Sequence, residues 1–412
     1  MRFGRTISTL LAALLLATAT AGAAVPDKPV VLTGAMGGDM ELIRYGDGFF
    51  GVWRSDTPTG HATLQGRRFS RTGRPIGAAF AIEPRRQSQH DLGGVVLVPV
   101  SATDVAVFWH GMGRFFTVSL NAAIVRPSTA TVLRTTDLVP VDDRHLAATK
   151  GADGTISVAY TDVEAVPLPA REIIRVIRLK ADLTVLPGSA GLNGAAGEQQ
   201  DGFVNTDFAL IDRQGGTLGL HLRRRGTYPV ALMAHRLGAG GKPVGAPIKI
   251  NTTTMANVAS FYYTPFEASM ARLADGRIVV TWPSLERTTT SSFDRWEIRA
   301  RILSATGIPA GPDFLVNTVR AGMQIAPEVQ PLASGGFVIA WVSKGTGGAV
   351  AYQHRGFDRK GKPLYAPRTS RSGMSPSLLD TMNTVRLKDG SLAIVHNVLG
   401  AGTAYGIANV SR

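Results

Sequence analysis

Cysteine is absent from this chain of 412 residues. Its absence excludes disulfide bridges, thiolate metal sites, a cysteine nucleophile and a lipid anchor attached to cysteine. Charged residues are also scarce, at 18% of the chain, whereas hydrophobic residues make up 44%. A chain with this length and composition can bury a large core, so we do not expect global disorder.

The chain also lacks a hydrophobic run long enough to cross a membrane. The apolar run at residues 9–17 is shorter than the roughly 20 residues that a spanning helix needs. Arg2 and Arg5 precede this run, and Ala21-Gly22-Ala23 follows it as a cleavage signal. These features predict a secretory signal peptide over residues 1–23. We therefore expect one exported domain over residues 24–412, secreted or periplasmic, without a transmembrane segment.

One short motif recurs along the rest of the chain. A turn, usually Asp-Gly or Gly-Gly, precedes four or five mostly apolar residues, and an aromatic residue or a histidine ends the run. Such turns between β-prone runs predict hairpins, and the continuous apolar run predicts a strand buried on both faces. The runs end, at intervals of 51 to 61 residues, at Trp53, Trp109, Tyr160, His221, Trp282, Trp341 and His396.

A second motif follows most of these strands. A β-prone run with basic residues meets a turn, usually containing glycine, then proline or a small apolar residue, and then another short β-prone run. This pattern predicts a second hairpin, and its basic, proline-bearing strands suit an exposed sheet edge. The copies lie at residues 64–83, 174–188, 232–252, 298–318 and 351–370.

Four strands in about 55 residues, repeated seven times, predict an all-β fold, a seven-bladed β-propeller with four-stranded antiparallel blades. The last repeat ends early, so we expect the segment at residues 28–36 to supply its outer strand and to close the ring. The second repeat is weak, because residues 115–135 lack the glycine turn. A ring of six blades is the alternative if that repeat forms no blade.

Three segments carry a resemblance to a known group of proteins. They are Gly335-Gly336-Phe337-Val338-Ile339-Ala340-Trp341, Phe357-Asp358-Arg359-Lys360-Gly361 and Val316-Asn317-Thr318. The chain resembles bacterial exported proteins with tandem propeller repeats of the Gly-Gly-Phe-Val-x-x-Trp type. The resemblance implies a propeller and bacterial export, but no particular activity, because similar propellers serve many roles.

Catalytic and metal-binding motifs are not found in the sequence. There are no sialidase-type Asp boxes, no Gly-x-Ser-x-Gly elbow, no paired histidines and no calcium loop. His221 and His396 occupy the position of the motif aromatics, so we expect them to pack between blades. We therefore assign no catalytic residue, no metal ligand and no cofactor.

Two groups of residues are candidates for ligand binding, because the loops that carry them are expected on one face. Arg85 and Arg86 lie in one loop, and Arg223-Arg224-Arg225 in another; arginine binds carboxylate, phosphate and sulfate groups bidentately. Tyr262 and Tyr263 lie in the longest link between blades, where exposed rings could stack on sugars. The alternatives are a solvated basic rim and a loop held down by its own aromatic residues.

The net charge is +14, and loss of the two arginines of the signal peptide leaves +12. This charge favours anionic partners, although no motif for dedicated nucleic-acid binding is present. We expect a monomeric, non-catalytic binding or scaffold module for an anionic glycan or a protein partner. The alternative is a carbohydrate-active enzyme, a glycoside hydrolase or polysaccharide lyase, with Glu267, Glu286 and Asp294 as acid/base candidates.

Overall fold

The computed structural model describes the chain from residue 30 to residue 411 with gaps between strands. The described residues are 30–36, 40–56, 61–88, 92–112, 118–141, 145–164, 171–188, 190–191, 208–225, 228–253, 268–285, 296–345, 350–374, 382–388, 390–400 and 403–411. The predicted signal peptide lies outside them. Every regular element in this part of the chain is a β-strand, and no helix in it is long and apolar enough to cross a membrane.

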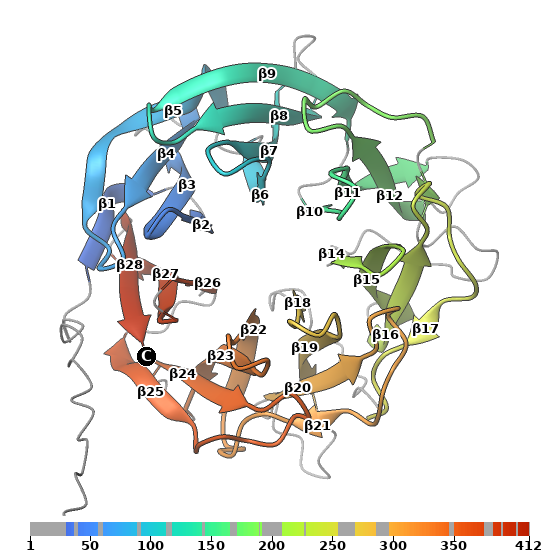
Figure 1. The fold of residues 1–412 in the computed structure, drawn as a ribbon. Coiled ribbons are helices and arrows are strands. Elements are labelled where there is room, and N and C mark those ends of the chain that lie inside the picture. The colour runs from blue at the N-terminus through green and yellow to red at the C-terminus, as the bar shows by residue number, and fades with distance from the viewer. Residues whose placement is uncertain are drawn as a thin grey trace, which may run out of the picture.

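The strands form an all-β propeller, as the repeats predict. Within the described residues there are seven four-stranded antiparallel sheets, which we call blades 1 to 7. They stand around a central axis, each beside the next (Figure 1), and we call the region around this axis the channel. The first strand of each blade borders the channel, and the fourth strand lies at the rim.

The blades follow the order of the sequence, except that the two ends of the chain share blade 7. Blades 1 to 3 comprise β2 (Met40–Tyr45), β3 (Gly48–Asp56), β4 (His61–Phe69), β5 (Pro75–Ser88); β6 (Gly93–Pro99), β7 (Val105–Met112), β8 (Val118–Arg126), β9 (Thr131–Pro140); and β10 (Leu146–Lys150), β11 (Ile156–Glu164), β12 (Arg171–Leu179), β13 (Ala190–Gly191). Blades 4 and 5 comprise β14 (Phe208–Arg213), β15 (Gly216–Arg225), β16 (Tyr228–Leu237), β17 (Ile248–Lys249); and β18 (Ser269–Arg272), β19 (Ile278–Leu285), β20 (Trp296–Leu303), β21 (Phe314–Leu315). Blades 6 and 7 comprise β22 (Met323–Pro331), β23 (Phe337–Lys344), β24 (Val350–Phe357), β25 (Arg368–Met374); and β26 (Met382–Arg386), β27 (Leu392–Gly400), β28 (Thr403–Ser411), β1 (Val30–Met36).

Two places where the repeat weakens are nevertheless complete sheets. In blade 7, β1 pairs antiparallel with β28, so that an N-terminal strand lies beside a C-terminal one. In blade 2, β8 and β9 pair over most of their length and are joined by a tight turn. Ala130 closes this turn with a φ of 53°, a left-handed conformation that glycine adopts in other turns of the chain. The missing glycine therefore weakens the sequence pattern without removing the hairpin.

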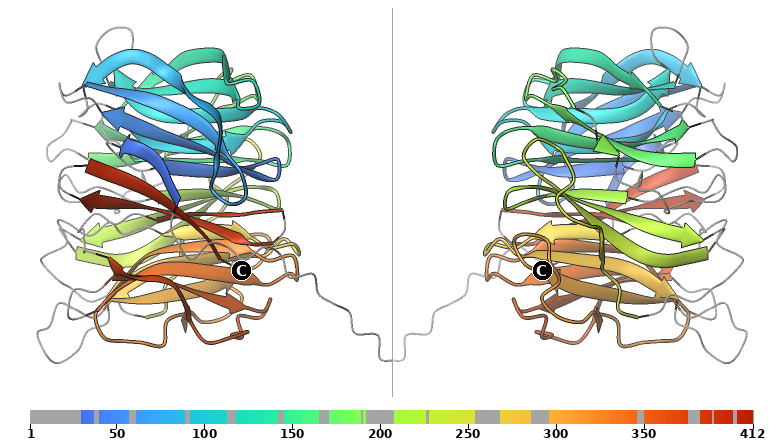
Figure 2. Two further views of the ribbon diagram at one scale, coloured as in Figure 1. Left: turned by 90° about the vertical axis from the view of Figure 1, so that its left-hand side faces the viewer. Right: turned by 90° about the vertical axis from the view of Figure 1, so that its right-hand side faces the viewer.

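The two faces of the disc carry different connections. Because the strands of each blade alternate in direction, the turns between the first and second strands lie on the same side as the turns between the third and fourth strands. We call this side the turn face, and the opposite side, which holds the other connections and the links between blades, the link face. Figure 2 shows the disc from its edge, with the hairpins of the turn face gathered along one side.

The motif aromatics pack each blade onto the one before it. Trp109 of blade 2 is buried in one cluster with Phe50 of blade 1, and Trp341 of blade 6 is buried with Ile298 of blade 5. Trp53 and Trp282 are buried in the same way against blades 7 and 4. These large rings contribute much of the apolar packing between neighbouring blades.

Polar residues of the second hairpin close its ends. The Oδ1 atom of Asn317 accepts a hydrogen bond from the backbone nitrogen of Ile298 at 2.8 Å, and Asn251 makes the same contact in blade 4. Asp358 accepts hydrogen bonds at 2.8 and 2.9 Å from the backbone nitrogens two and four residues later. The Val-Asn-Thr and Phe-Asp-x-x-Gly segments are thus explained by strand and turn closure.

Candidate functional site

A ring of side chains lines the channel at one level. Each member is on the first strand of its blade. Its partner on the second strand is the residue just before the motif aromatic or histidine; Glu41, for example, pairs with Val52, which precedes Trp53. All members are partly exposed, as expected beside a channel. This channel ring consists of Glu41, Val96, Ala147, Ala209, Ser269, Glu328 and Asn383.

The channel ring is divided into a polar and an apolar part. Blades 2, 3 and 4 contribute valine and alanine, whereas the consecutive blades 5, 6, 7 and 1 contribute Ser269, Glu328, Asn383 and Glu41. The Ser269 hydroxyl donates a hydrogen bond to Oε2 of Glu328 at 3.3 Å, and the Asn383 amide donates one to Oε2 of Glu41 at 2.7 Å. Two carboxyl groups are therefore held on one arc of the channel wall.

Glu328 is the group that the channel perturbs most. Burial among protein atoms and, to a smaller extent, the nearby carboxylate of Glu41 raise its pKa to about 8, although the hydrogen bond from Ser269 acts in the opposite direction. The carboxyl of Glu328 is therefore protonated at neutral pH. The residue as a whole is partly exposed.

The pair lies near the middle of the height of the blades. Glu41 is the second residue of β2, remote from the turn of its hairpin, whereas Glu328 is the sixth of the nine residues of β22, nearer its turn. Their partners Val52 and Ala340 lie near the middle of β3 and β23. A protonated carboxyl and a second carboxylate beside it are the groups that general acid/base cleavage of a glycosidic bond requires.

The arginines predicted from the sequence belong to the link face. Arg85 and Arg86 lie near the end of β5, and Arg223-Arg224-Arg225 form the end of β15; both strands run toward that face. Their role in ligand binding stays a prediction. Tyr262, Tyr263 and the acidic candidates Glu267, Glu286 and Asp294 lie outside the described residues.

Sequence reasoning missed Glu41 and Glu328, because it searched the loops. The available signal was an acidic residue in two of the runs before the hairpin turns, MELIRYG and APEVQP. Only the register of the strands shows that these two residues share one level.

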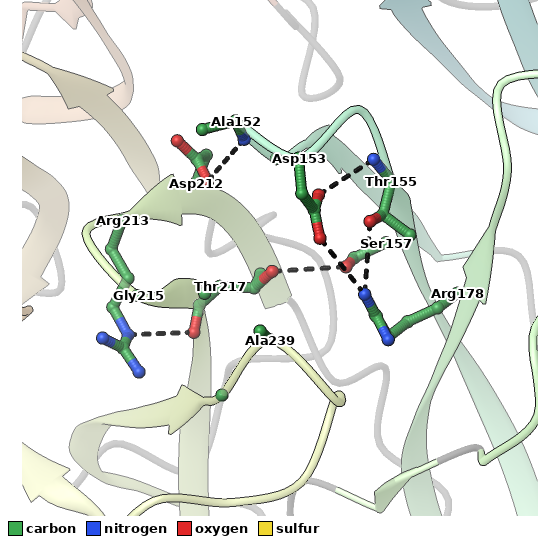
Figure 3. Close-up of a pocket in the computed structure, with 13 residues that line it drawn as sticks. Ala152, Asp153, Thr155, Ser157, Arg178, Asp212, Arg213, Gly215, Thr217 and Ala239 are labelled. Carbon is green, nitrogen blue, oxygen red and sulfur yellow. Dashed lines mark hydrogen bonds and ion pairs between the residues drawn. The ribbon is translucent and has the colours of Figure 1, made fainter.

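A hollow lies at the turn face between blades 3 and 4, with a volume of about 180 Å³. Figure 3 shows that its polar groups bond one another. Asp153 accepts a hydrogen bond from the backbone nitrogen of Thr155 at 2.9 Å and pairs with Arg178 at 3.4 Å, while Ser157 and Thr217 join the two blades at 3.2 Å. Hydrogen bonds from Thr155 hold the pKa of Asp153 below its usual range. This network fastens blade 3 to blade 4.

Buried histidines in blade 4 have a structural role. The rings of His221 and His235 lie 4.8 Å apart, and burial lowers their pKa values to about 3 and about 4. Both are neutral at physiological pH. Among the described residues, no group of three His, Cys, Asp or Glu side chains is placed to hold a metal ion.

Comparison with known proteins establishes the fold. No protein-family model and no curated protein matches the sequence. Among solved structures, a polysaccharide lyase of family PL25, an ulvan lyase, is similar with a TM-score of 0.55 and 8% identity over 93% of this chain and 96% of that one. The GH93 α-L-arabinofuranosidase of Fusarium graminearum, in complex with arabinobiose, is similar with a TM-score of 0.50 and 12% identity over 80% of this chain and 95% of that one.

Proposed function

We propose that the protein is an exported carbohydrate-active enzyme, a glycoside hydrolase whose catalytic pair is Glu328 and Glu41. The observation that carries this proposal is the protonated carboxyl of Glu328 near a second carboxylate, Glu41, both on partly exposed residues of the channel ring. A general acid needs a proton at working pH, and a raised pKa supplies it.

Each group then has a definite part in the reaction. Glu328 donates its proton to the glycosidic oxygen as the bond to the leaving sugar breaks. Glu41, oriented by the amide of Asn383, either activates a water molecule or attacks the anomeric carbon itself. Ser269 holds the carboxyl of Glu328 in place through its hydroxyl.

The fold is compatible with this chemistry. Two propellers of similar shape, named above, are described as an arabinofuranosidase and an ulvan lyase. Paired carboxyl groups favour hydrolysis over the non-catalytic capture of an anionic glycan, because a carboxylate in the channel repels an anion. A module that only binds has no need of a perturbed carboxyl in its channel.

The test is a screen of soluble polysaccharides and aryl glycosides by release of reducing ends or of the aryl group. For any substrate cleaved, Glu328→Gln should lower kcat/KM about 10²- to 10⁴-fold. Glycosides with a very acidic leaving group should lose much less, because they depart without a proton. Wild-type kcat/KM should fall as pH rises through about 8.

Asp47 provides the control position, and two outcomes would contradict the proposal. Asp47→Asn changes an exposed carboxylate in a turn of blade 1 and should leave the rate unchanged. Full activity in both Glu328→Gln and Glu41→Gln would place catalysis elsewhere. Glycan binding without cleavage by the wild type would instead support the binding-module hypothesis.

A further inference from the structure

Large aliphatic side chains are exposed at the same place in successive blades. Six of them lie in or just beyond the turns between the third and fourth strands of blades 1 to 6, and each is between 42% and 54% exposed. We call these turns the outer turns and the six residues the rim aliphatics. They are Ile76, Leu133, Val185, Val244, Ile308 and Leu364.

In five blades their positions fall within one residue of a common register. In five blades the last residue of the third strand pairs with a residue of the outer turn, and the rim aliphatic is that residue or its direct neighbour. The pairs are Phe69 with Pro75, Leu179 with Val185, Leu237 with Pro243, Leu303 with Pro309 and Phe357 with Pro363. A single exposed aliphatic residue is ordinary, but here one recurs in the outer turn of each of six blades, within reach of one flat surface.

The same turns are strongly basic. Three acidic residues accompany the seven basic ones, and all three have partners. Asp182 accepts a hydrogen bond from the backbone nitrogen of Thr184 at 3.0 Å, and Asp358 accepts from two backbone nitrogens. Asp313 pairs with Arg299 at 3.0 Å. All seven basic residues are exposed. They are Arg71, Arg74, Lys180, Lys242, Arg359, Lys360 and Lys362.

We propose that the turn face docks on an anionic lipid bilayer. The outer turns lie along one side of the disc (Figure 2), so a flat surface can touch many of them at once. Lysine and arginine would bind anionic headgroups, while the rim aliphatics enter the boundary of the acyl chains. A soluble polyanion would match the charges alone and leave the aliphatic residues exposed.

Docking in this way leaves the opposite face free. The link-face mouth of the channel would point away from the bilayer. This inference rests on the outer turns alone and is independent of the proposed hydrolase activity.

The test is co-sedimentation of the protein with vesicles of phosphatidylcholine, alone or mixed with phosphatidylglycerol. We expect binding only to the mixed vesicles. A rim variant, Ile76→Ser with Val244→Ser and Leu364→Ser, should lower the partition coefficient at least about tenfold. A charge variant, Lys242→Gln with Lys360→Gln and Lys362→Gln, should abolish binding at low salt.

The matched control is Val319→Ser, which removes an equally exposed valine beyond the fourth strand of blade 5, at the link-face end. It should bind vesicles as the wild type does. Thermal unfolding of every variant checks that the surface substitutions leave the fold intact. The proposal is overturned if mixed vesicles are not bound, if the rim variant binds them like the wild type, or if neutral vesicles are bound equally well.

Discussion

Replacing Glu328 by glutamine should stabilise the protein at neutral pH while it removes activity. Glutamine has nearly the shape of a protonated carboxyl and keeps an oxygen that can accept from Ser269. Unlike the carboxyl, it does not titrate. A residue kept for catalysis at a cost to stability is expected to behave in this way.

The size of the effect follows from the shifted pKa of Glu328. The pKa of Glu328 has an ordinary value of 4.5 and a folded value of about 8. Between these two pH values the unfolded chain has lost a proton that the folded chain retains. Stability therefore falls as pH rises through this window, by about 1.4 kcal/mol per pH unit. The loss reaches about 3 kcal/mol at pH 7, and contact with channel solvent makes this value an upper limit.

The assay is denaturant unfolding of the wild type and of Glu328→Gln at several pH values. The difference should be near zero at pH 4, grow through pH 7 and become constant above pH 8. Glu41→Gln should reduce this difference, because the carboxylate of Glu41 contributes to the raised pKa. A difference that is the same at pH 4 and pH 8.5 would refute the assignment of a protonated Glu328.

Three further changes test the packing. Trp341→Ala, at a fully buried ring, should lower the free energy of unfolding by about 3–5 kcal/mol in denaturant titrations. Ala130→Gly should raise it by about 1 kcal/mol, because the residue has a φ of 53°. His221→Phe should protect the protein against acid, because the pKa of His221 is lowered to about 3. Below pH 6.5 the free energy of unfolding of the wild type therefore falls by about 1.4 kcal/mol per pH unit. Denaturant unfolding of both proteins at pH 7 and pH 4.5 measures the difference.

The propeller could be predicted because its determinants are local and repeated. A hairpin turn, a buried apolar run and a terminal ring recur at nearly constant spacing, and the buried Trp53, Trp109, Trp282 and Trp341 lie where that pattern places them. The sequence pattern is weakest where a residue other than glycine adopts the left-handed conformation of the turn. Ala130 adopts the conformation that a glycine-based search expects only of glycine.

The candidate site was harder to predict because it is not local. Glu41 and Glu328 are 287 residues apart, and each alone resembles any polar residue on a half-buried strand. Their relation depends on the register of two hairpins and on the closure of the ring, which brings blade 6 and blade 1 to either side of blade 7. The sequence analysis instead favoured clusters of charged and aromatic residues in loops. Such residues are close together in the sequence, so they can be recognised without knowledge of the fold.

The two proposed sites lie in different parts of the disc, the carboxyl pair near the axis and the outer turns toward the rim of the turn face, and this separation gives the final prediction. Glu328→Gln should bind mixed vesicles like the wild type, because Glu328 lies within the channel and away from the outer turns. The rim variant should cleave soluble substrates at the wild-type rate but act more slowly on a substrate displayed on anionic vesicles. Parallel rate measurements on the soluble and displayed substrate check this; equal rates of the rim variant and the wild type on both would show that docking does not serve catalysis.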